Sequence, residues 1–424
     1  MNRDRIFLDV AEKIGSHLYK SAYWHDKRCN WIGKAIVEIA PMVTMTYNKS
    51  LGCDVYDGTG GIAFFLSNLY RHTRNDNYKI AAESAINHAL SKVNELAHTV
   101  RFSFFTGKVG IAYISSQLGN DLDKNILNEK SLEILKELEE NFEKEHLMDI
   151  ISGNASGIPA LLELYSFFED DKILNLAVLL GDELIETATK ESHGWSWDNK
   201  ANGVLSVANN LTGFSHGAAG IGYSLLELYN VTKDSKFLNA AKNAFSYENH
   251  WFNEQNNNWP DFRSQGKKSQ NNSDLTYAVS WCHGAPGIGL SRLRAYDIIK
   301  DVKYLADSGA SLKTSEMILE KIMNSNTNHN FADFSLCHGL SGICETLLYA
   351  SKIFKDETYK SLAEKVGHYG IEKYHNTYLP WPCGIKGAAE TPSLMLGLAG
   401  IGHFYLQLYD SLKISNPLML IPEV

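Results

Sequence analysis

Hydrophobic residues recur along this chain at the spacing of α-helices. The segment 130–145 has charged residues on most of its surface and one apolar stripe, which consists of Leu132, Leu135, Leu138 and Phe142. Segments 175–190 and 360–375 show the same pattern. Alternating β-branched runs joined by tight turns, which would indicate strands, are scarce. The pattern therefore predicts an all-α fold.

A glycine-rich pattern recurs seven times and divides the chain into similar units. Each copy has two glycines three or four residues apart, followed by an apolar run typical of a helix buried on all sides. The second glycines stand 47 to 67 residues apart and are Gly61, Gly110, Gly157, Gly220, Gly287, Gly342 and Gly400. Such units either stack as an open solenoid or close into a ring of inner and outer helices. In a closed ring, the residues before the glycines would line a shared central cavity.

Two segments interrupt the repeats. Residues 253–274 are polar and rich in asparagine, which predicts a long surface loop. Because this loop precedes one of the glycine turns, we expect it to border the mouth of the cavity. Residues 415–424, SNPLMLIPEV, form a short apolar tail that we expect to pack on the outside of the protein.

Composition and charge narrow the class of protein. The chain has 424 residues, of which 44% are hydrophobic, and a net charge of −9. This charge argues against a protein that binds nucleic acid. No apolar run reaches the roughly 20 residues of a membrane span, and the N-terminus lacks the apolar core of a secretion signal. We therefore expect a cytoplasmic protein that is not transmembrane and whose cysteines stay reduced.

Cysteine and histidine precede the glycines of neighbouring repeats. Cys-His-Gly occurs twice, at Cys282-His283 and Cys337-His338, and His216 has the same place one repeat earlier. Equivalent positions of neighbouring repeats should lie close together, and Cys with His are preferred ligands of zinc. Three protein ligands would leave an open catalytic position, whereas four, with His283, would close a structural site. A site with three protein ligands is the more economical interpretation, because the side chains of adjacent residues diverge and rarely reach the same metal ion.

Two thiolates and one imidazole would make a neutral, electron-rich zinc centre. Such a centre generates hydroxide poorly but is suited to binding and deprotonating a substrate thiol. The donor set therefore favours thiol alkylation or addition over hydrolysis. Glycoside hydrolases, which also use helical toroids, need two carboxylates. Acidic residues beside the glycine turns are few (Asp57 and Asp149), and that function would leave the cysteines unexplained.

The motifs resemble those of the LanC-like cyclases, which form lanthionine in peptide natural products. Four motifs carry the resemblance: SWCHGAPGIG (280–289) and SLCHGLSGI (335–343) for zinc, GFSHGAAGIG (213–222) for the active-site histidine, and MDIISGNASG (148–157) for an aspartate. The ending at 391–410 resembles, more specifically, the cyclase domain of class II lanthipeptide synthetases. Some family members have an arginine shortly before the first zinc cysteine, and the sequence LTYAVSW has none there.

The resemblance implies an (α/α) toroid of about seven inner and seven outer helices. It implies one cyclase domain over residues 1–424, with core repeats at about 50–410, and Zn²⁺ held by Cys282, Cys337 and His338. The implied enzyme is a lanthionine synthetase. It would join peptide cysteine thiolates to dehydroalanine or dehydrobutyrine by Michael-type addition, which gives thioether rings.

The resemblance also implies roles for three further residues. His216 would act as the acid or base, since imidazole titrates near neutral pH, and Asp149 would orient it. His283 is a third catalytic candidate, which either points into the cavity or supports a ligand through a hydrogen bond. The substrate would be a dehydrated precursor peptide. Because the sequence contains no dehydratase region, we expect a separate dehydratase protein or domain as a partner.

Two alternatives to peptide cyclisation are kept. In the first, the chain is a non-catalytic, zinc-containing module that binds a peptide or acts as a scaffold, and His283 closes the zinc site. In the second, the family chemistry is retained but glutathione is the thiol added to dehydrated residues. The ending that resembles class II synthetases weighs against the second alternative.

Overall fold

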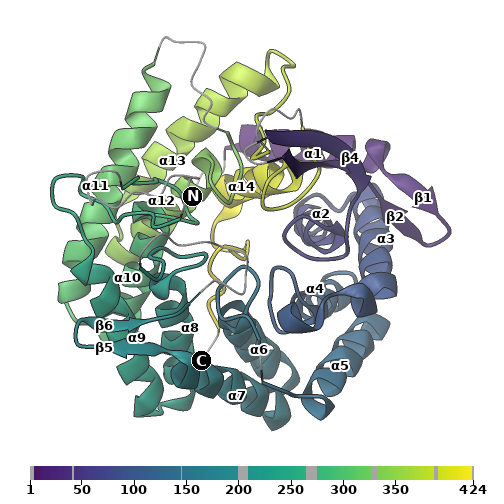
Figure 1. Ribbon diagram of the computed structural model, residues 1–424. Helices are drawn as coiled ribbons and strands as arrows, with labels where there is room; N and C mark the ends of the chain where they lie inside the picture. The colour runs from purple at the N-terminus through teal and green to yellow at the C-terminus, as the bar shows by residue number, and fades with distance from the viewer. Residues whose placement is uncertain are drawn as a thin grey trace.

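The helices of this protein form two concentric rings (Figure 1). The computed structural model describes residues 4–40, 43–144, 146–198, 209–263, 275–325, 333–385 and 390–422, and fourteen α-helices lie within them. The inner helices are α2 (Thr59–Thr73), α4 (Lys108–Asp121), α6 (Asn154–Phe168), α8 (Ala218–Thr232), α10 (Ala285–Ile299), α12 (Leu340–Phe354) and α14 (Leu398–Asp410). The outer helices are α1 (Arg5–Ser21), α3 (Asp76–Lys92), α5 (Asn125–Glu140), α7 (Asp171–Thr187), α9 (Ser235–His250), α11 (Lys303–Met323) and α13 (Glu357–Gly370). The predicted all-α toroid is confirmed, and the open solenoid is excluded.

The two ends of the chain close the ring. Each inner helix packs against the outer helix that follows it in the chain, except α14, whose outer partner is α1. The inner helices α14 and α2 are also neighbours. The last unit is therefore completed by the N-terminal helix, and the ring closes through contacts between opposite ends of the chain.

The turns from inner to outer helices share a local sequence. After α2, α6, α8, α10 and α12, one non-glycine residue adopts the left-handed conformation, with φ between 54° and 61°. The next residue is always Asn or Asp, and its side chain accepts a hydrogen bond from the backbone N–H two residues later. An Asx side chain in this position satisfies N–H groups that the start of a helix leaves unpaired. Local chemistry thus sets these tight helix–helix turns.

The burial of the helices follows the predicted pattern with one local difference. The inner helices are buried almost all round, whereas the outer ones bury one stripe. Helix α5 begins before the predicted stripe and buries Leu135 and Leu138, but 39% of Leu132 is exposed. Its partly buried neighbour Phe142 lies beyond the end of the helix. The described residues contain no helix that is both long enough and apolar enough to cross a membrane.

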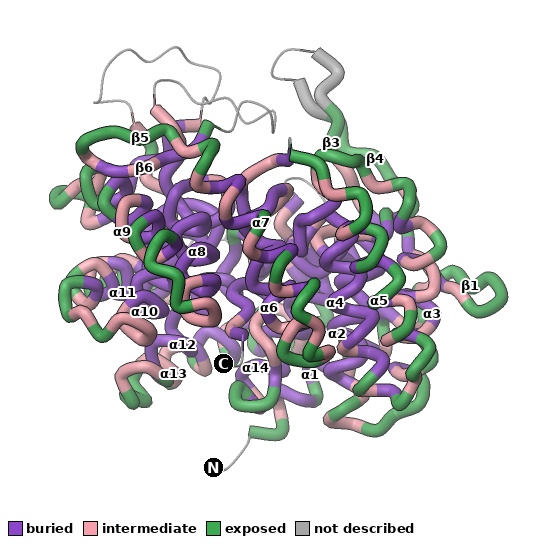
Figure 2. Tube along the Cα trace, turned by 90° about the horizontal axis from the view of Figure 1, so that it is seen from below, coloured by how far each residue is buried: buried purple, intermediate pink, exposed green. Residues whose placement is uncertain are grey.

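Strands are few and form antiparallel pairs. The described strands are β1 (Tyr23–His25) with β2 (Arg28–Asn30), β3 (Ile32–Ala40) with β4 (Val43–Ser50), and β5 (Thr189–Glu191) with β6 (Gly194–Ser196). The pairs β3–β4 and β5–β6 precede the inner helices α2 and α8 and lie at one end of the ring (Figure 2).

The second glycine of each repeat allows a close approach of backbone segments. A Cβ atom on Gly342 would overlap the carbonyl oxygen of Leu336, and one on Gly287 would overlap that of Trp281. Both glycines lie in the first turn of an inner helix, where no left-handed conformation is needed. Each glycine therefore lets its helix begin against the chain segment that leads into it.

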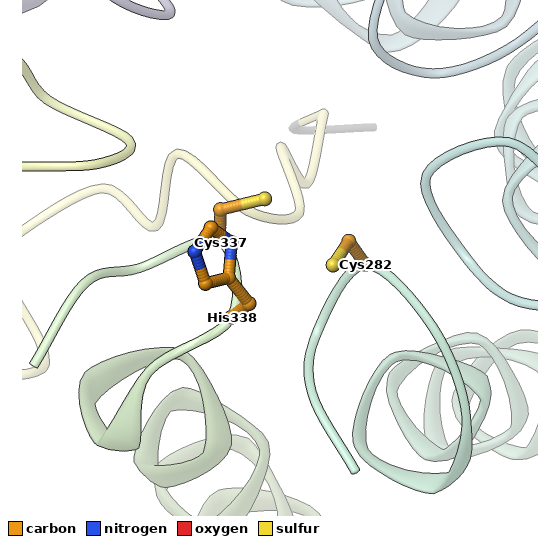
Figure 3. A group of neighbouring side chains, drawn as sticks. All are labelled: Cys282, Cys337 and His338. Atoms are coloured by element: carbon orange, nitrogen blue, oxygen red, sulfur yellow. The ribbon is translucent and has the colours of Figure 1, made fainter. Parts of the chain in front are cut away.

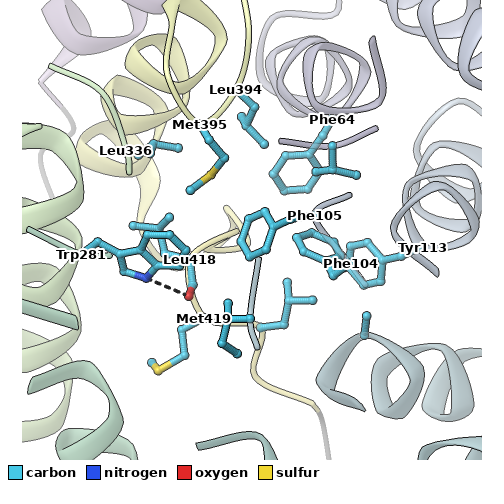
Figure 4. Packing of buried hydrophobic residues seen from close by; sticks show 14 of the residues in the cluster. Phe64, Phe104, Phe105, Tyr113, Trp281, Leu336, Leu394, Met395, Leu418 and Met419 are labelled. Carbon is cyan, nitrogen blue, oxygen red and sulfur yellow. Dashed lines mark hydrogen bonds between the residues drawn. The ribbon is translucent and has the colours of Figure 1, made fainter. Parts of the chain in front are cut away.

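Side chains fill the middle of the ring, where a central cavity shared by the glycine turns was expected (Figure 4). The residues three positions before the first glycines form a buried apolar layer, which consists of Val55, Phe104, Ile150, Phe214, Trp281, Leu336 and Leu394. The C-terminal tail also lies inside. Leu418 and Met419 are each 2% exposed, and the segment after α14 runs through the centre of the ring (Figure 1). The prediction that the C-terminal tail packs on the outside of the protein was therefore wrong. Seven inner helices leave a space along the ring axis, and apolar side chains must fill it.

A cavity of about 960 Å³ lies at the end of the ring where the inner helices terminate. The middle and C-terminal parts of α2, α4, α6, α12 and α14 line it, together with part of the tail. Glu345 of α12 contributes a buried carboxyl group to its wall, and Oε1 of this group has no hydrogen-bond partner among the described atoms. The glycine turns lie at the opposite end of the same helices.

Candidate metal centre and proton-transfer pair

A belt of backbone hydrogen bonds joins the glycine turns of different repeats. The N–H of Cys282 donates to the carbonyl of Cys337 (3.2 Å), and the N–H of Cys337 donates to Met395 (3.0 Å). The N–H of Met395 donates in turn to the carbonyl of Tyr56 (3.0 Å), and that of Ser215 donates to Cys282 (3.1 Å). All five residues stand two positions before the first glycine of their repeat. The belt brings equivalent positions of distant repeats together at one end of the ring.

The belt places the three predicted zinc ligands in one cluster (Figure 3). The ligand atoms of Cys282, Cys337 and His338 all lie within 4.8 Å of one another. Cys282 comes from the turn before α10, and the other two come from the turn before α12. Cys337 is buried, whereas 37% of the His338 side chain is exposed. The cluster has the composition and compactness of a site that could hold a metal ion.

The donor types, two thiols and one imidazole, are among those that bind zinc in proteins. The ligand atoms lie close enough together, all within 4.8 Å, for one ion to contact all three after small side-chain adjustments. Nε2 of His338 lies 2.8 Å from the carbonyl oxygen of Gly384, to which it donates when the ring is neutral. Nδ1 is then the nitrogen with a lone pair for the metal, and the Gly384 carbonyl holds the ring in place.

The two thiols share a strongly perturbed environment. Hydrogen bonding from Cys337 holds the pKa of Cys282 well below its ordinary value, against the opposing effect of burial, and His338 adds to the lowering. The hydrogen bond to Cys282 and burial raise the pKa of Cys337 well above its ordinary value. Burial lowers the pKa of His338, but Cys282 and Asp333 outweigh it and raise the value to about 9. The lowered pKa of Cys282 favours its thiolate, which is the form of cysteine that ligates a metal ion.

Tyr56 is a member of this site that sequence reasoning missed. Its hydroxyl lies 3.1 Å from Sγ of Cys337 and donates to it. Burial raises the pKa of Tyr56 well above its ordinary value, and the neighbouring Cys337 raises it further. The signal was present in the sequence, because Tyr56 stands two residues before Gly58, the same offset as each cysteine from its glycine.

His216 and Asp149 form the second functional group of the site. Nδ1 of His216 lies 2.6 Å from Oδ2 of Asp149, which is wholly buried. Asp149 is fixed in turn by the backbone N–H of Ser152, which donates to Oδ1 at 2.7 Å. These residues come from the turns before α6 and α8, and the turn that carries His216 lies directly beside the turn that carries Cys282. The sequence-predicted pair is therefore brought together next to the cysteine–histidine cluster.

His283 lies beside the cluster but does not belong to it. Its ring centre is 5.7 Å from that of His216, its Nε2 is 3.5 Å from Oγ of Ser215, and its Nδ1 is 4.0 Å from Asp261. The residue is 1% exposed, and burial lowers the pKa of its imidazole to about 4. Because its ring is directed to Ser215 and Asp261, His283 is not placed as a fourth ligand that would close a structural site.

Arg263 reaches the site from the loop before α10. Its guanidinium donates to both carboxylate oxygens of Asp261, at 2.6 to 3.1 Å. Burial lowers the pKa of Arg263, but Asp261 and the charges of Cys282 and Cys337 outweigh it and raise the pKa above its ordinary value. Residues 253–274 were predicted to form a surface loop, but residues 258–262 are buried, and residues 264–274 lie outside the described part of the chain.

Comparisons with known proteins show which family and which fold this chain resembles. Residues 49–421 match the model of the family described as lanthionine synthetase C-like protein. The lacticin 481/lactococcin biosynthesis protein LcnDR2 of Lactococcus lactis subsp. lactis is 24% identical over 406 residues, which are 93% of this chain and 40% of that protein. The chain thus spans about 40% of the length of this curated relative. The structure of nisin cyclase superposes with a TM-score of 0.67 at 18% identity and covers 98% of both chains, which shows a shared fold.

Proposed function

Because this chain belongs to the lanthionine synthetase C-like family, we propose that it is a zinc-dependent lanthipeptide cyclase. Its substrate would be a dehydrated precursor peptide, whose cysteine thiols add to dehydroalanine or dehydrobutyrine to form thioether rings. One observation carries the proposal: the Cys282–Cys337–His338 cluster and the His216–Asp149 pair lie on neighbouring turns of one ring. A thiol-binding group and a proton-transfer group at one place are what thiol addition requires.

The cluster would supply the metal chemistry. Cys282, Cys337 and His338 would hold the zinc ion. When bound, zinc would accept the substrate thiol at the position that the protein ligands leave open, and it would keep the sulfur nucleophilic. The positive charge of Arg263 would favour negative charge on the cluster sulfurs.

His216 would move the proton. In the addition, the sulfur forms a bond to the β-carbon of the dehydrated residue, and the electron pair of the double bond moves to the α-carbon. Nε2 of His216 takes the proton that the thiol releases. A proton is returned to the α-carbon, so no atom is gained or lost overall. Asp149 accepts from Nδ1–H, which keeps Nε2 as the nitrogen that exchanges the proton. We assign His283 a supporting role beside His216, because the buried ring is directed to Ser215 and Asp261.

The proposal includes the setting of the reaction. Residues 1–424 would act as one cyclase domain, and a separate dehydratase protein or domain would supply the dehydrated peptide. A reducing compartment such as the cytoplasm suits a reaction that depends on free thiols. We also propose that the thiol that adds is a cysteine within the peptide and not glutathione.

Metal analysis combined with a cyclisation assay tests this function. The purified protein is expected to contain about one zinc per chain, and a dehydrated peptide should lose its alkylatable thiols without a change in mass. Cys337→Ala should lose both properties. Cys344→Ala is the matched control, because Cys344 is an equally buried cysteine outside the cluster. Absence of zinc from a folded wild-type protein would overturn the proposal. Zinc without ring formation would favour a binding module, and addition of glutathione to the peptide would favour the other alternative.

A further inference from the structure

The C-terminal tail is bound inside the inner ring by several parts of the protein. The side chains of His403 and Gln407, both on α14, donate to the carbonyls of Ser415 (2.9 Å) and Ile414 (3.1 Å), which follow the helix. The hydroxyl of Tyr223, on α8, donates to the carbonyl of Leu420. The tail is therefore fixed to inner helices on different sides of the ring.

The same tail also contacts the residue that precedes the first candidate metal ligand. Nε1 of Trp281 donates to the carbonyl oxygen of Leu418 at 3.3 Å (Figure 4). The indole is wholly buried, with its ring centre 5.7 Å from that of Phe105 and 5.6 Å from that of Phe214. The only polar atom of this side chain thus finds its partner on the tail, within an apolar layer where an unpaired N–H is costly.

Trp281 transmits this contact to the belt of the site. Its neighbour Cys282 donates its N–H to Cys337, and the Cys282 carbonyl accepts both the N–H (3.1 Å) and the hydroxyl (3.0 Å) of Ser215. Ser215 directly precedes His216. The position of Trp281 is therefore linked through Cys282 to the turns that carry His338 and His216.

We infer that the tail is a positioning element of the reaction site. Its Leu418 carbonyl accepts the hydrogen bond from the indole N–H of Trp281, and this contact fixes where the Cys282 turn lies along the ring axis relative to the rest of the cluster. Trp281 is accordingly a positioning residue, and neither it nor the tail contacts the reacting atoms. This inference deepens the proposed function and rests on it for the identity of the metal and the substrate. The spatial relation between the tail, Trp281 and Cys282 does not depend on that identity.

Trp281→Phe in the full-length protein is the first test, because it keeps the aromatic packing and removes the N–H. We expect weaker zinc affinity by about tenfold and a shifted absorption spectrum of the cobalt-substituted protein, with kcat lowered more than KM is raised. Trp259→Phe is the matched control, because Trp259 is 1% exposed and its Nε1 has no partner among the described atoms. An unchanged affinity and cobalt spectrum in Trp281→Phe would overturn the inference.

Removal of residues 417–424 provides the second test, with rescue by a synthetic peptide of the same residues. In the truncated protein, the rate at which iodoacetamide alkylates Cys282 in the metal-free state should change relative to Cys383, and added peptide should restore it. A peptide with Leu418→Asp should not. This readout needs neither metal nor catalysis, so it separates failure of the inference from failure of the proposed function. If the truncated chain keeps its helical circular dichroism and its wild-type alkylation rates, the inference is wrong. If the truncated chain does not fold, Trp281→Phe alone decides.

Discussion

Nδ1 of His216 lies 2.6 Å from Oδ2 of Asp149, and 67 residues of sequence separate the two side chains. The N–H of Ile150 donates to the carbonyl of Ser215 at 3.0 Å, so backbone pairing between two glycine turns sets this contact. Burial of Asp149 and the bond from Ser152 leave the carboxylate little freedom. The tautomer and orientation of the histidine are therefore determined by the ring.

Asp149→Asn should slow cyclisation by roughly 10²- to 10⁴-fold without loss of zinc. The amide can offer an N–H to Nδ1, which would stabilise the wrong tautomer of His216. Mass spectrometry of thioether formation under single-turnover conditions measures the rate. His216→Ala should cost a similar factor, and the double variant should be no slower than the worse single variant, because the residues act as a unit. Multiplicative losses would show that the two residues act independently.

Tyr56→Phe should weaken zinc binding by about tenfold. The variant removes the hydroxyl that donates to Sγ of Cys337 and keeps the ring. Competition with a chelator of known affinity provides the measurement. Tyr405→Phe is the control, since it removes a comparably buried hydroxyl that donates to the carbonyl of Gly367 (2.8 Å), away from the cluster. Equal zinc affinities in the two variants would contradict a role of Tyr56 at the metal centre.

Gly342→Ala should destabilise the fold by about 3 kcal/mol or more, because the new Cβ overlaps the backbone carbonyl of Leu336, which cannot move away easily. Gly309→Ala should stabilise it by about 0.5–1 kcal/mol. Gly309 lies within α11, and no atom lies within 4 Å of the position of its Cβ. Urea unfolding followed by circular dichroism gives both values. The close-approach explanation fails if Gly342→Ala is as stable as the wild type.

Glu345→Gln should change how stability depends on pH. Burial raises the pKa of Glu345 from 4.5 to about 8. Between these values the folded state holds a proton that the unfolded state has lost, so the free energy of unfolding falls as pH rises from about 4.5 to 8 and levels off above that. At about 1.4 kcal/mol per pKa unit, this group contributes at most about 5 kcal/mol to the fall.

The glutamine variant lacks this slope, so its stability relative to wild type should increase steadily from pH 5 to pH 8. Unfolding free energies measured at several pH values provide the test. Glu133→Gln is the control, because the Glu133 side chain is 63% exposed. Parallel pH profiles for wild type and Glu345→Gln would show that this carboxyl is ionised in the folded protein.

The cysteine–histidine part of the site could be predicted because its local sequence is repeated. Cys282 and Cys337 stand at the same offset from glycines that begin similar helices. Identical local turns place equivalent side chains at equivalent points of a ring, so repetition predicted that the two Cys-His pairs lie close together. The resemblance to the LanC-like cyclases then singled out Cys282, Cys337 and His338. His216 and Asp149 followed from the resemblance of their motifs. Tyr56 was missed, although its offset is the same, because a tyrosine does not indicate metal chemistry by itself.

The sequence by itself determined the helical class, the alternation of apolar and amphipathic helices, and the turns that carry the chemistry. These features depend on residues within about one turn or one repeat of each other. Only the tertiary structure decided that the ring closes through α1 and α14, that Tyr56 meets Cys337 across 281 residues, and that the tail fills the axis beneath Trp281. The curvature summed over seven packed units sets these contacts, and no local pattern encodes that sum.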